Sequence, residues 1–191
     1  MTLDEDHPGM FHAAIEMSLV PIVLADPHQH DCPIVFANGA FCEMTGYDLA
    51  EIVGRNCRFL QGPATDRQAV ARIRDAISAR WHCTEELLNY RKDGTPFWNA
   101  LFINPVFDQG GRLVFLFGTQ LNVTRRRALE DALQQSYELL PVMQAHLAAA
   151  LALPMSDAQR QHLQRIAQAI DQSAHHQRPL LSNAAASGEP S

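Results

Sequence analysis

Residues 54–62 read GRNCRFLQG and place one cysteine, Cys57, between Arg55 and Arg58. Neighbouring cations favour the thiolate form of a cysteine, which is the reactive form. By this argument Cys57 is a candidate nucleophile, redox sensor or adduct-forming residue. The alternative is a small buried hydrophobic residue, the commonest fate of a free cysteine. The nine residues alone leave both interpretations open.

The flanking sequence predicts a sheet with helices inserted between its strands. Two β-branched apolar runs, VPIVLAD (20–26) and PIVFAN (33–38), predict a hairpin. Residues 39–61 are broken by glycines and predict several short helical turns. Residues 65–79 then predict a longer helix, which Thr65 or Asp66 could cap.

Three longer strands follow, at residues 82–91, 96–107 and 112–123, joined by the turn signals KDG and QGG. With the hairpin they make a five-stranded antiparallel sheet with helices on one face, which is an α+β fold.

The C-terminal third has a different pattern, because leucines recur at helical spacing after Thr124. Pro141 predicts a kink or break near Leu140. A second helix is expected after Pro154, where Ser156 and Gln159 form a capping box. The chain therefore divides into an N-terminal cap helix (1–19), a sheet domain (20–123), a helical hairpin (124–177) and a disordered tail (178–191).

Composition excludes several classes of function. The chain has 191 residues and a net charge of −6, which argues against a nucleic-acid partner. Its four cysteines lack the paired spacing of zinc sites and of disulfide frameworks, so no metal is expected. We find no signal peptide and no apolar run long enough for a membrane span, and predict a soluble cytoplasmic protein.

The order of elements is that of the PAS superfamily, and GRNCRFLQG resembles the signature of LOV domains, its blue-light-sensing, flavin-binding branch. The resemblance extends from about Val20 to Val123. It includes NY at 89–90, FWN at 97–99 and the glutamine at 120.

This resemblance implies that Cys57 is the photoactive residue, which adds as a neutral thiol to carbon C4a of an excited flavin. The flanking arginines then need not be thiolate-forming groups. Guanidinium groups bind phosphate through paired, charge-assisted hydrogen bonds, so Arg58 and Arg74 favour FMN over riboflavin or FAD. The complete cofactor-binding set that the resemblance implies is Asn56, Arg58, Gln61, Arg74, Asn89, Asn99, Leu101 and Gln120.

Strand alternation supports the same pocket, because it places Asn99 and Leu101 on one face of their strand. On the neighbouring strand it places Leu87 and Asn89 together. Amides and apolar walls can thus line a single cleft, where the polar edge of a flavin needs hydrogen-bond partners. When flavin N5 becomes protonated, Gln120 can rotate its side-chain amide so that its oxygen accepts a hydrogen bond from N5. This change of hydrogen bonding would pass the signal to the flanking helices.

The output is expected to be a change of dimer state or partner binding, with homodimerisation through the N- and C-terminal helices. Alternatively, these helices pack on the sheet of their own chain and do not mediate dimerisation. The hairpin also resembles that of histidine kinases, with His146 in place of the phosphoacceptor, but no nucleotide-binding signature accompanies it, so no enzyme is predicted. Arg125, Arg126 and Arg127 are expected in a solvated turn. The rival functions are a flavin-dependent redox sensor or flavoenzyme, and a PAS module without a cofactor.

Overall fold

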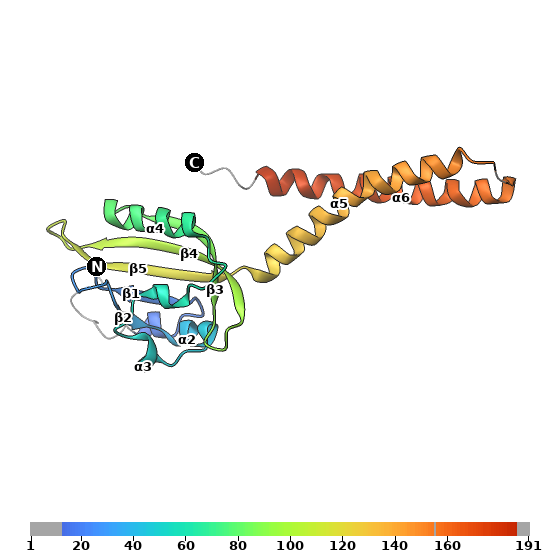
Figure 1. Ribbon diagram of the computed structural model, residues 1–191. Helices are drawn as coiled ribbons and strands as arrows, with labels where there is room; N and C mark the ends of the chain where they lie inside the picture. The colour runs from blue at the N-terminus through green and yellow to red at the C-terminus, as the bar shows by residue number, and fades with distance from the viewer. Residues whose placement is uncertain (1–12, 155, 187–191) are drawn as a thin grey trace. The chain divides into compact units, whose positions relative to one another are not determined.

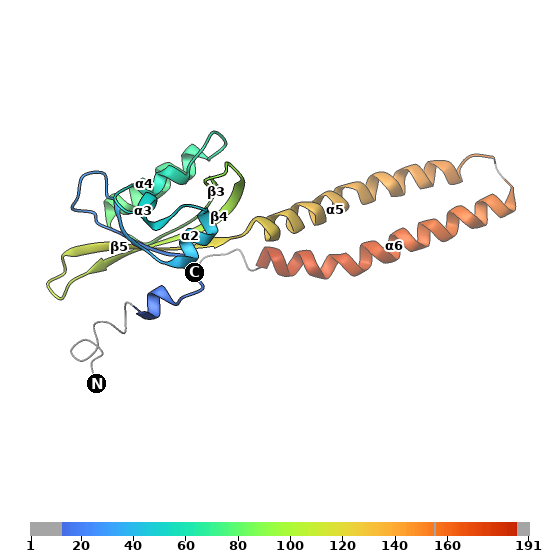
Figure 2. The same ribbon diagram turned by 90° about the horizontal axis from the view of Figure 1, so that it is seen from below.

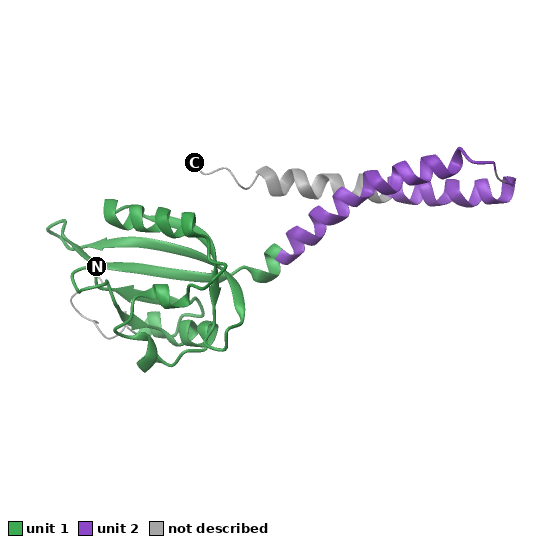
Figure 3. Cartoon of the chain, viewed as in Figure 1, with its two compact units in different colours: residues 1–127 green, residues 128–191 purple. Residues whose placement is uncertain are grey.

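The structure is a computed structural model that describes residues 13–154 and 156–186, with side chains described as far as residue 172. The chain forms two compact units, residues 1–127 and 128–191, coloured separately in Figure 3. Most of the expected N-terminal helix lies outside the described residues, within which residues 13–16 are helical.

The first unit is built on one antiparallel sheet with the strand order β2-β1-β5-β4-β3 (Figure 1). Each predicted strand is confirmed to within two residues at either end, because apolar alternation and turn signals are local properties of the chain. The strands are β1 (Ile22–Ala25), β2 (Ile34–Ala37), β3 (Cys83–Tyr90), β4 (Pro96–Phe107) and β5 (Leu113–Asn122).

The helices between β2 and β3 lie on one face of the sheet, as predicted, and Figure 2 shows α3 and α4 on the same side. Asp66 caps α4, since its side chain accepts a hydrogen bond from the amide of Gln68 at 2.8 Å. The elements are α2 (Gly39–Thr45), α3 (Leu49–Ile52), the 3-10 helix η1 (Cys57–Leu60) and α4 (Arg67–Ala79).

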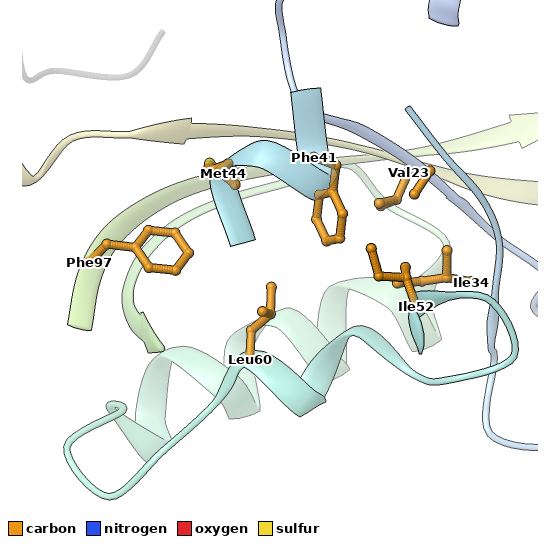
Figure 4. Packing of buried hydrophobic residues seen from close by; sticks show 8 residues of the cluster. Val23, Ile34, Phe41, Met44, Ile52, Leu60 and Phe97 are labelled. Carbon is orange, nitrogen blue, oxygen red and sulfur yellow. The ribbon is translucent and has the colours of Figure 1, made fainter. Parts of the chain in front are cut away.

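A hydrophobic cluster holds the short helices against the sheet (Figure 4). Phe41 of α2, Ile52 of α3 and Leu60 of η1 are all at most 1% exposed. Because Leu60 is anchored here, the η1 turn that carries Cys57 has a fixed position relative to the strands. The complete cluster is Val23, Ile34, Ala37, Phe41, Met44, Ile52, Leu60 and Phe97.

Asn38 joins three segments through one fully buried amide. Its Oδ1 accepts from the backbone amides of Ile22, at 2.9 Å, and Phe41, at 3.2 Å. Its Nδ2 donates to the carbonyls of Ile15, Ser18 and Val20 at 2.9–3.2 Å. The N-terminal segment, β1 and α2 are therefore held by the same side chain.

The second unit contains most of α5 (Thr124–Leu151) and all of α6 (Asp157–Ala186). Asn122 caps the start of α5 by accepting from the Thr124 amide at 3.1 Å, and Ser156 and Gln159 form the expected capping box. None of the helices in the described part of the chain has the length and apolar character that a membrane crossing requires.

Two expectations for these helices differ from the structure. Of the expected kink or break near Leu140, the break does not occur: α5 continues through Pro141, since a proline removes only one backbone donor and the turns on either side keep theirs. In addition, α6 runs to Ala186, through residues 178–186 that were expected to be disordered.

The first turn of α5 is clamped onto the sheet. Thr124 Oγ1 accepts from the Trp98 amide at 2.9 Å, and the Arg127 guanidinium carbon lies 3.7 Å from the centroid of the Trp98 ring. Arg127 also donates to Glu86 of β3 at 2.9 Å, and Arg126 pairs with the same carboxylate. The expectation of a solvated turn is therefore wrong for Arg127, which is partly buried against the sheet, whereas Arg126 is exposed as expected.

Replacing Asn38 tests whether its side chain holds the N-terminal segment, β1 and α2 together. Asn38→Ala leaves buried backbone donors and acceptors without partners, so we expect the free energy of unfolding to fall by about 2–4 kcal/mol. Urea unfolding followed by circular dichroism measures this change. The matched control is Asn104→Ala at an exposed position of β4, which should change stability by less than about 0.5 kcal/mol. Equal effects of the two substitutions would contradict the role of Asn38.

Candidate functional site

A cavity of about 250 Å³ lies between the sheet and the segments that carry η1 and α4. It brings together every site residue expected from the sequence. These are Asn56, Cys57, Arg58, Gln61, Arg74, Asn89, Asn99, Leu101 and Gln120.

The walls of the cavity follow from strand alternation. Leu101 of β4 is the register partner of Gln120 on β5, and Leu87 of β3 is that of Asn99 on β4. Their side chains share the face that α4 covers, where Ile73 and Ile77 complete the lining. The interior therefore combines apolar walls with a small number of polar groups, as is typical of small-molecule sites.

Cys57 opens η1 and directs its thiol at this cavity. Burial raises the pKa of the Cys57 thiol to about 12, with a smaller contribution from Cys32. Both neighbouring arginines have partners other than the thiol: Arg55 lies over the rings of Phe59, at 4.3 Å, and Tyr47, at 5.7 Å, while Arg58 pairs with Asp31. Cys57 is therefore a neutral thiol at physiological pH, and Arg55 is a packing residue.

Two arginines, Arg58 and Arg74, are among the residues that line the cavity. Asn56 also reaches its wall, but its amide has protein partners. Its Oδ1 accepts from the Arg58 amide at 3.0 Å, and its Nδ2 donates to the carbonyls of Asp31, at 2.6 Å, and Cys32, at 3.2 Å. These bonds favour a positioning role for Asn56 within the expected set.

Three buried amides form the polar part of the site. Asn89, Asn99 and Gln120 are 1–3% exposed. Asn99 Nδ2 donates to Asn89 Oδ1 at 2.9 Å. Asn99 Oδ1 and both polar atoms of Gln120, however, are buried without a hydrogen-bond partner in the protein. An unpaired buried polar group costs about 1–3 kcal/mol, so these atoms indicate a ligand with complementary donors and acceptors.

Sequence reasoning missed several residues of the cavity wall, and Gly118 and Cys32 are two of them. A Cβ atom on Gly118 would lie 2.9 Å from Val23 Cγ2 and 3.3 Å from Gln120 Nε2, so a glycine is needed to leave room beside Gln120. A glycine inside an apolar strand is the signal that could have identified it, since it often marks close approach of a ligand. Cys32, which was not among the expected site residues, also lines the cavity.

The donor set fits a flavin mononucleotide. Unpaired amides suit the polar edge of an isoalloxazine ring, and the aliphatic walls and Gly118 suit its flat body. The two guanidinium groups suit a phosphate.

Comparisons with known proteins agree on one family. A PAS domain model matches residues 20–125. A blue-light-activated histidine kinase 1 of Erythrobacter litoralis (strain HTCC2594) is 45% identical over 119 residues, which are 62% of this chain and 33% of the relative. The chain thus spans about a third of the length of this kinase.

Two solved structures extend the comparison. The light-state structure of the blue-light photoreceptor Aureochrome1 LOV is 43% identical, with a TM-score of 0.56, and the match covers 64% of this chain and 95% of that one. The light-state dimer of the fungal blue-light photoreceptor Vivid is 36% identical, with a TM-score of 0.54, over 55% of this chain and 78% of that one.

Alkylation tests the protonation state of Cys57. Raising its pKa from 9.0 to about 12 lowers the thiolate fraction at neutral pH roughly a thousandfold. We therefore expect iodoacetamide to modify Cys57 in the folded protein far more slowly than it modifies a free peptide of sequence GRNCRFLQG, as measured by mass spectrometry. The peptide keeps both arginines, so equal rates would show that the fold does not suppress ionisation.

Proposed function

The chain belongs to the PAS domain family and, within it, to the LOV domains, and we propose that it is a blue-light photoreceptor with FMN as its chromophore. One observation carries the proposal: an un-ionised thiol and three unpaired amide atoms face the same cavity. A thiol is the form that a light-driven addition requires, and the amides are the groups that a flavin edge would satisfy.

When bound, FMN would supply absorption of blue light and a carbon, C4a, that accepts a thiol in the excited state. The role of Cys57 is to provide both parts of the addition. Cys57 would supply the sulfur for C4a and, from its S–H bond, the proton for N5, so the addition would balance without an external oxidant or reductant. The reverse transfer restores the thiol in the dark. Burial of Cys57 favours this chemistry because it keeps the proton on sulfur beforehand.

The remaining polar residues would hold and orient the chromophore. Asn89 and Asn99 are already joined by a hydrogen bond, which fixes their amides relative to each other and leaves Asn99 Oδ1 for the ligand. Gln61 follows η1 on the cavity wall and suits the ribityl chain. Arg58 and Arg74 provide the positive charge for the phosphate.

Gln120 is the proposed switch. Neither its Oε1 nor its Nε2 has a partner in the protein, so rotation of the amide breaks no internal hydrogen bond. Gln120 could donate from Nε2 to a flavin N5 that accepts a hydrogen bond, and after rotation its Oε1 could accept from an N5 that carries hydrogen.

The route from Gln120 to the helices is short. Gln120 lies on β5 close to Asn122, which caps α5. The first turn of α5 also contacts Glu86 and Trp98 on the neighbouring strands. A rearrangement at the end of β5 would therefore reach α5 directly.

Absorbance spectroscopy tests the photochemistry. The purified protein should be yellow, bleach in blue light and recover in the dark. Cys57→Ala should bind the flavin without this reversible bleaching, since it lacks the attacking sulfur.

The control is Cys83→Ser, because Cys83 is buried but does not line the cavity, and this variant should bleach like the wild type. Reversible bleaching of Cys57→Ala would refute the role of Cys57. A protein that binds flavin but never bleaches would instead support the rival function, a flavin-dependent redox sensor or flavoenzyme. A protein that binds no flavin would refute both.

Homodimerisation is the proposed output, with a light-dependent change in dimer state or partner binding. Large apolar side chains are exposed along the helical unit, including Leu139 at 58% and Met143 at 49%, which are four residues apart on one side of α5. The similarity to the Vivid light-state dimer supports association of LOV domains in general. The family match covers residues 20–125, and we assign no catalytic role to the exposed His146.

Charged substitutions on α5 test the dimer. Leu139→Glu combined with Met143→Glu should weaken self-association at least about tenfold in sedimentation equilibrium, because the carboxylates would be buried on association. The control is Gln134→Glu with Gln135→Glu, which adds the same charge at exposed polar positions of α5 and should associate like the wild type. A wild type that remains monomeric in darkness and in light would refute homodimerisation.

A further inference from the structure

Asp31 contributes a negative charge beside the cavity, where its carboxylate pairs with the guanidinium of Arg58. The residue belongs to the loop between β1 and β2 and was not among the expected site residues. Asp31 and Cys32 both have left-handed backbone conformations, with φ of 68° and 47°. Such angles are uncommon for residues other than glycine, and they depend on support from surrounding contacts.

Asn56 provides much of that support. Its Nδ2 donates to the carbonyl of Asp31 at 2.6 Å, while its Oδ1 accepts from the amide of Arg58 at 3.0 Å. A further hydrogen bond, from the amide of Cys32 to the carbonyl of Gln29 at 3.1 Å, closes the loop. One asparagine thus fixes the backbone of both members of the ion pair, so the Asp31 carboxylate is held close to Arg58.

The two arginines of the cavity consequently differ. Arg58 shares its charge with Asp31, and the same contact lowers the pKa of the Asp31 carboxyl, so this group is ionised at neutral pH. Among the residues that the structure describes, no acidic side chain pairs with Arg74. A phosphate at this site would therefore find the guanidinium of Arg74 without an acidic partner and the guanidinium of Arg58 already paired with Asp31. The Asp31 carboxylate is negatively charged, like the phosphate, and would repel it.

We propose that Asp31 determines how strongly the pocket prefers a phosphorylated flavin to an unphosphorylated one. The inference rests on the flavin site proposed above. Asp31 competes with the phosphate for Arg58 and repels it through space, so it weakens FMN binding. Riboflavin lacks the phosphate, and Asp31 leaves its affinity unchanged. The preference of the pocket for FMN over riboflavin is therefore smaller than it would be if neither Arg58 nor Arg74 were paired with an acid.

The experiment measures dissociation constants of FMN and riboflavin for the flavin-free protein by quenching of flavin fluorescence. Asp31→Asn preserves the shape of the side chain and removes its charge. We expect the affinity for FMN to rise about fivefold, that for riboflavin to change less than about twofold, and the gain to shrink at high salt, as a charge effect must.

The matched control is Asp108→Asn, which removes the aspartate from another exposed Asp–Arg pair, with Arg112 in the β4–β5 turn and outside the cavity lining. It should leave the ratio of the two affinities unchanged. An unchanged or lower FMN preference in Asp31→Asn would overturn the role of Asp31 while leaving the flavin site intact. Wild-type protein that binds neither flavin would overturn both proposals.

Discussion

The need of buried amides for hydrogen-bond partners is the constraint on which the site depends. Gln120 and Asn99 are each 1% exposed, yet three of their polar atoms have no partner within the protein. A fold that served only its own stability would place apolar side chains there, because unpaired buried polar groups are costly. The sheet register brings these amides to one apolar cavity. Their combined cost is offset when a ligand with matching donors and acceptors binds.

The same protein environment determines the chemistry of Cys57. Its neighbours in the sequence are two cations, which favour a thiolate, but both have partners other than the thiol. Desolvation is then the dominant influence, and it keeps the thiol protonated. Neighbours along a chain and neighbours in space are different sets of residues, and here only the second set controls reactivity.

Sequence patterns predicted the parts of this molecule that depend on short-range periodicity. The strands, the cap at Asp66, and the common face of Asn99 and Leu101 follow from residues close together in the chain. Contacts between distant segments could not be predicted in this way. The Arg58–Asp31 pair joins residues 27 apart and requires a left-handed backbone at Asp31, for which the sequence carries no glycine as a signal.

Pro141 and Arg127 illustrate the same limit. Propensity correctly identifies proline as unfavourable within a helix, but α5 accommodates it where the surrounding turns supply enough hydrogen bonds. Arg127 resembles a solvated charge until β3 and β4 bring Glu86 and Trp98 beside it. In both cases a prediction from local sequence was overridden by contacts that local sequence does not describe: the hydrogen bonds of the neighbouring helical turns for Pro141, and the side chains of β3 and β4 for Arg127.

The clamp on the first turn of α5 has a mechanical consequence. Because Arg127 contacts both Trp98 of β4 and Glu86 of β3, the first turn of α5 cannot move without breaking a hydrogen bond or a cation–π contact to the sheet. The first residues of α5 therefore follow the positions of β3 and β4, and a shift of either strand is imposed on the backbone where α5 begins.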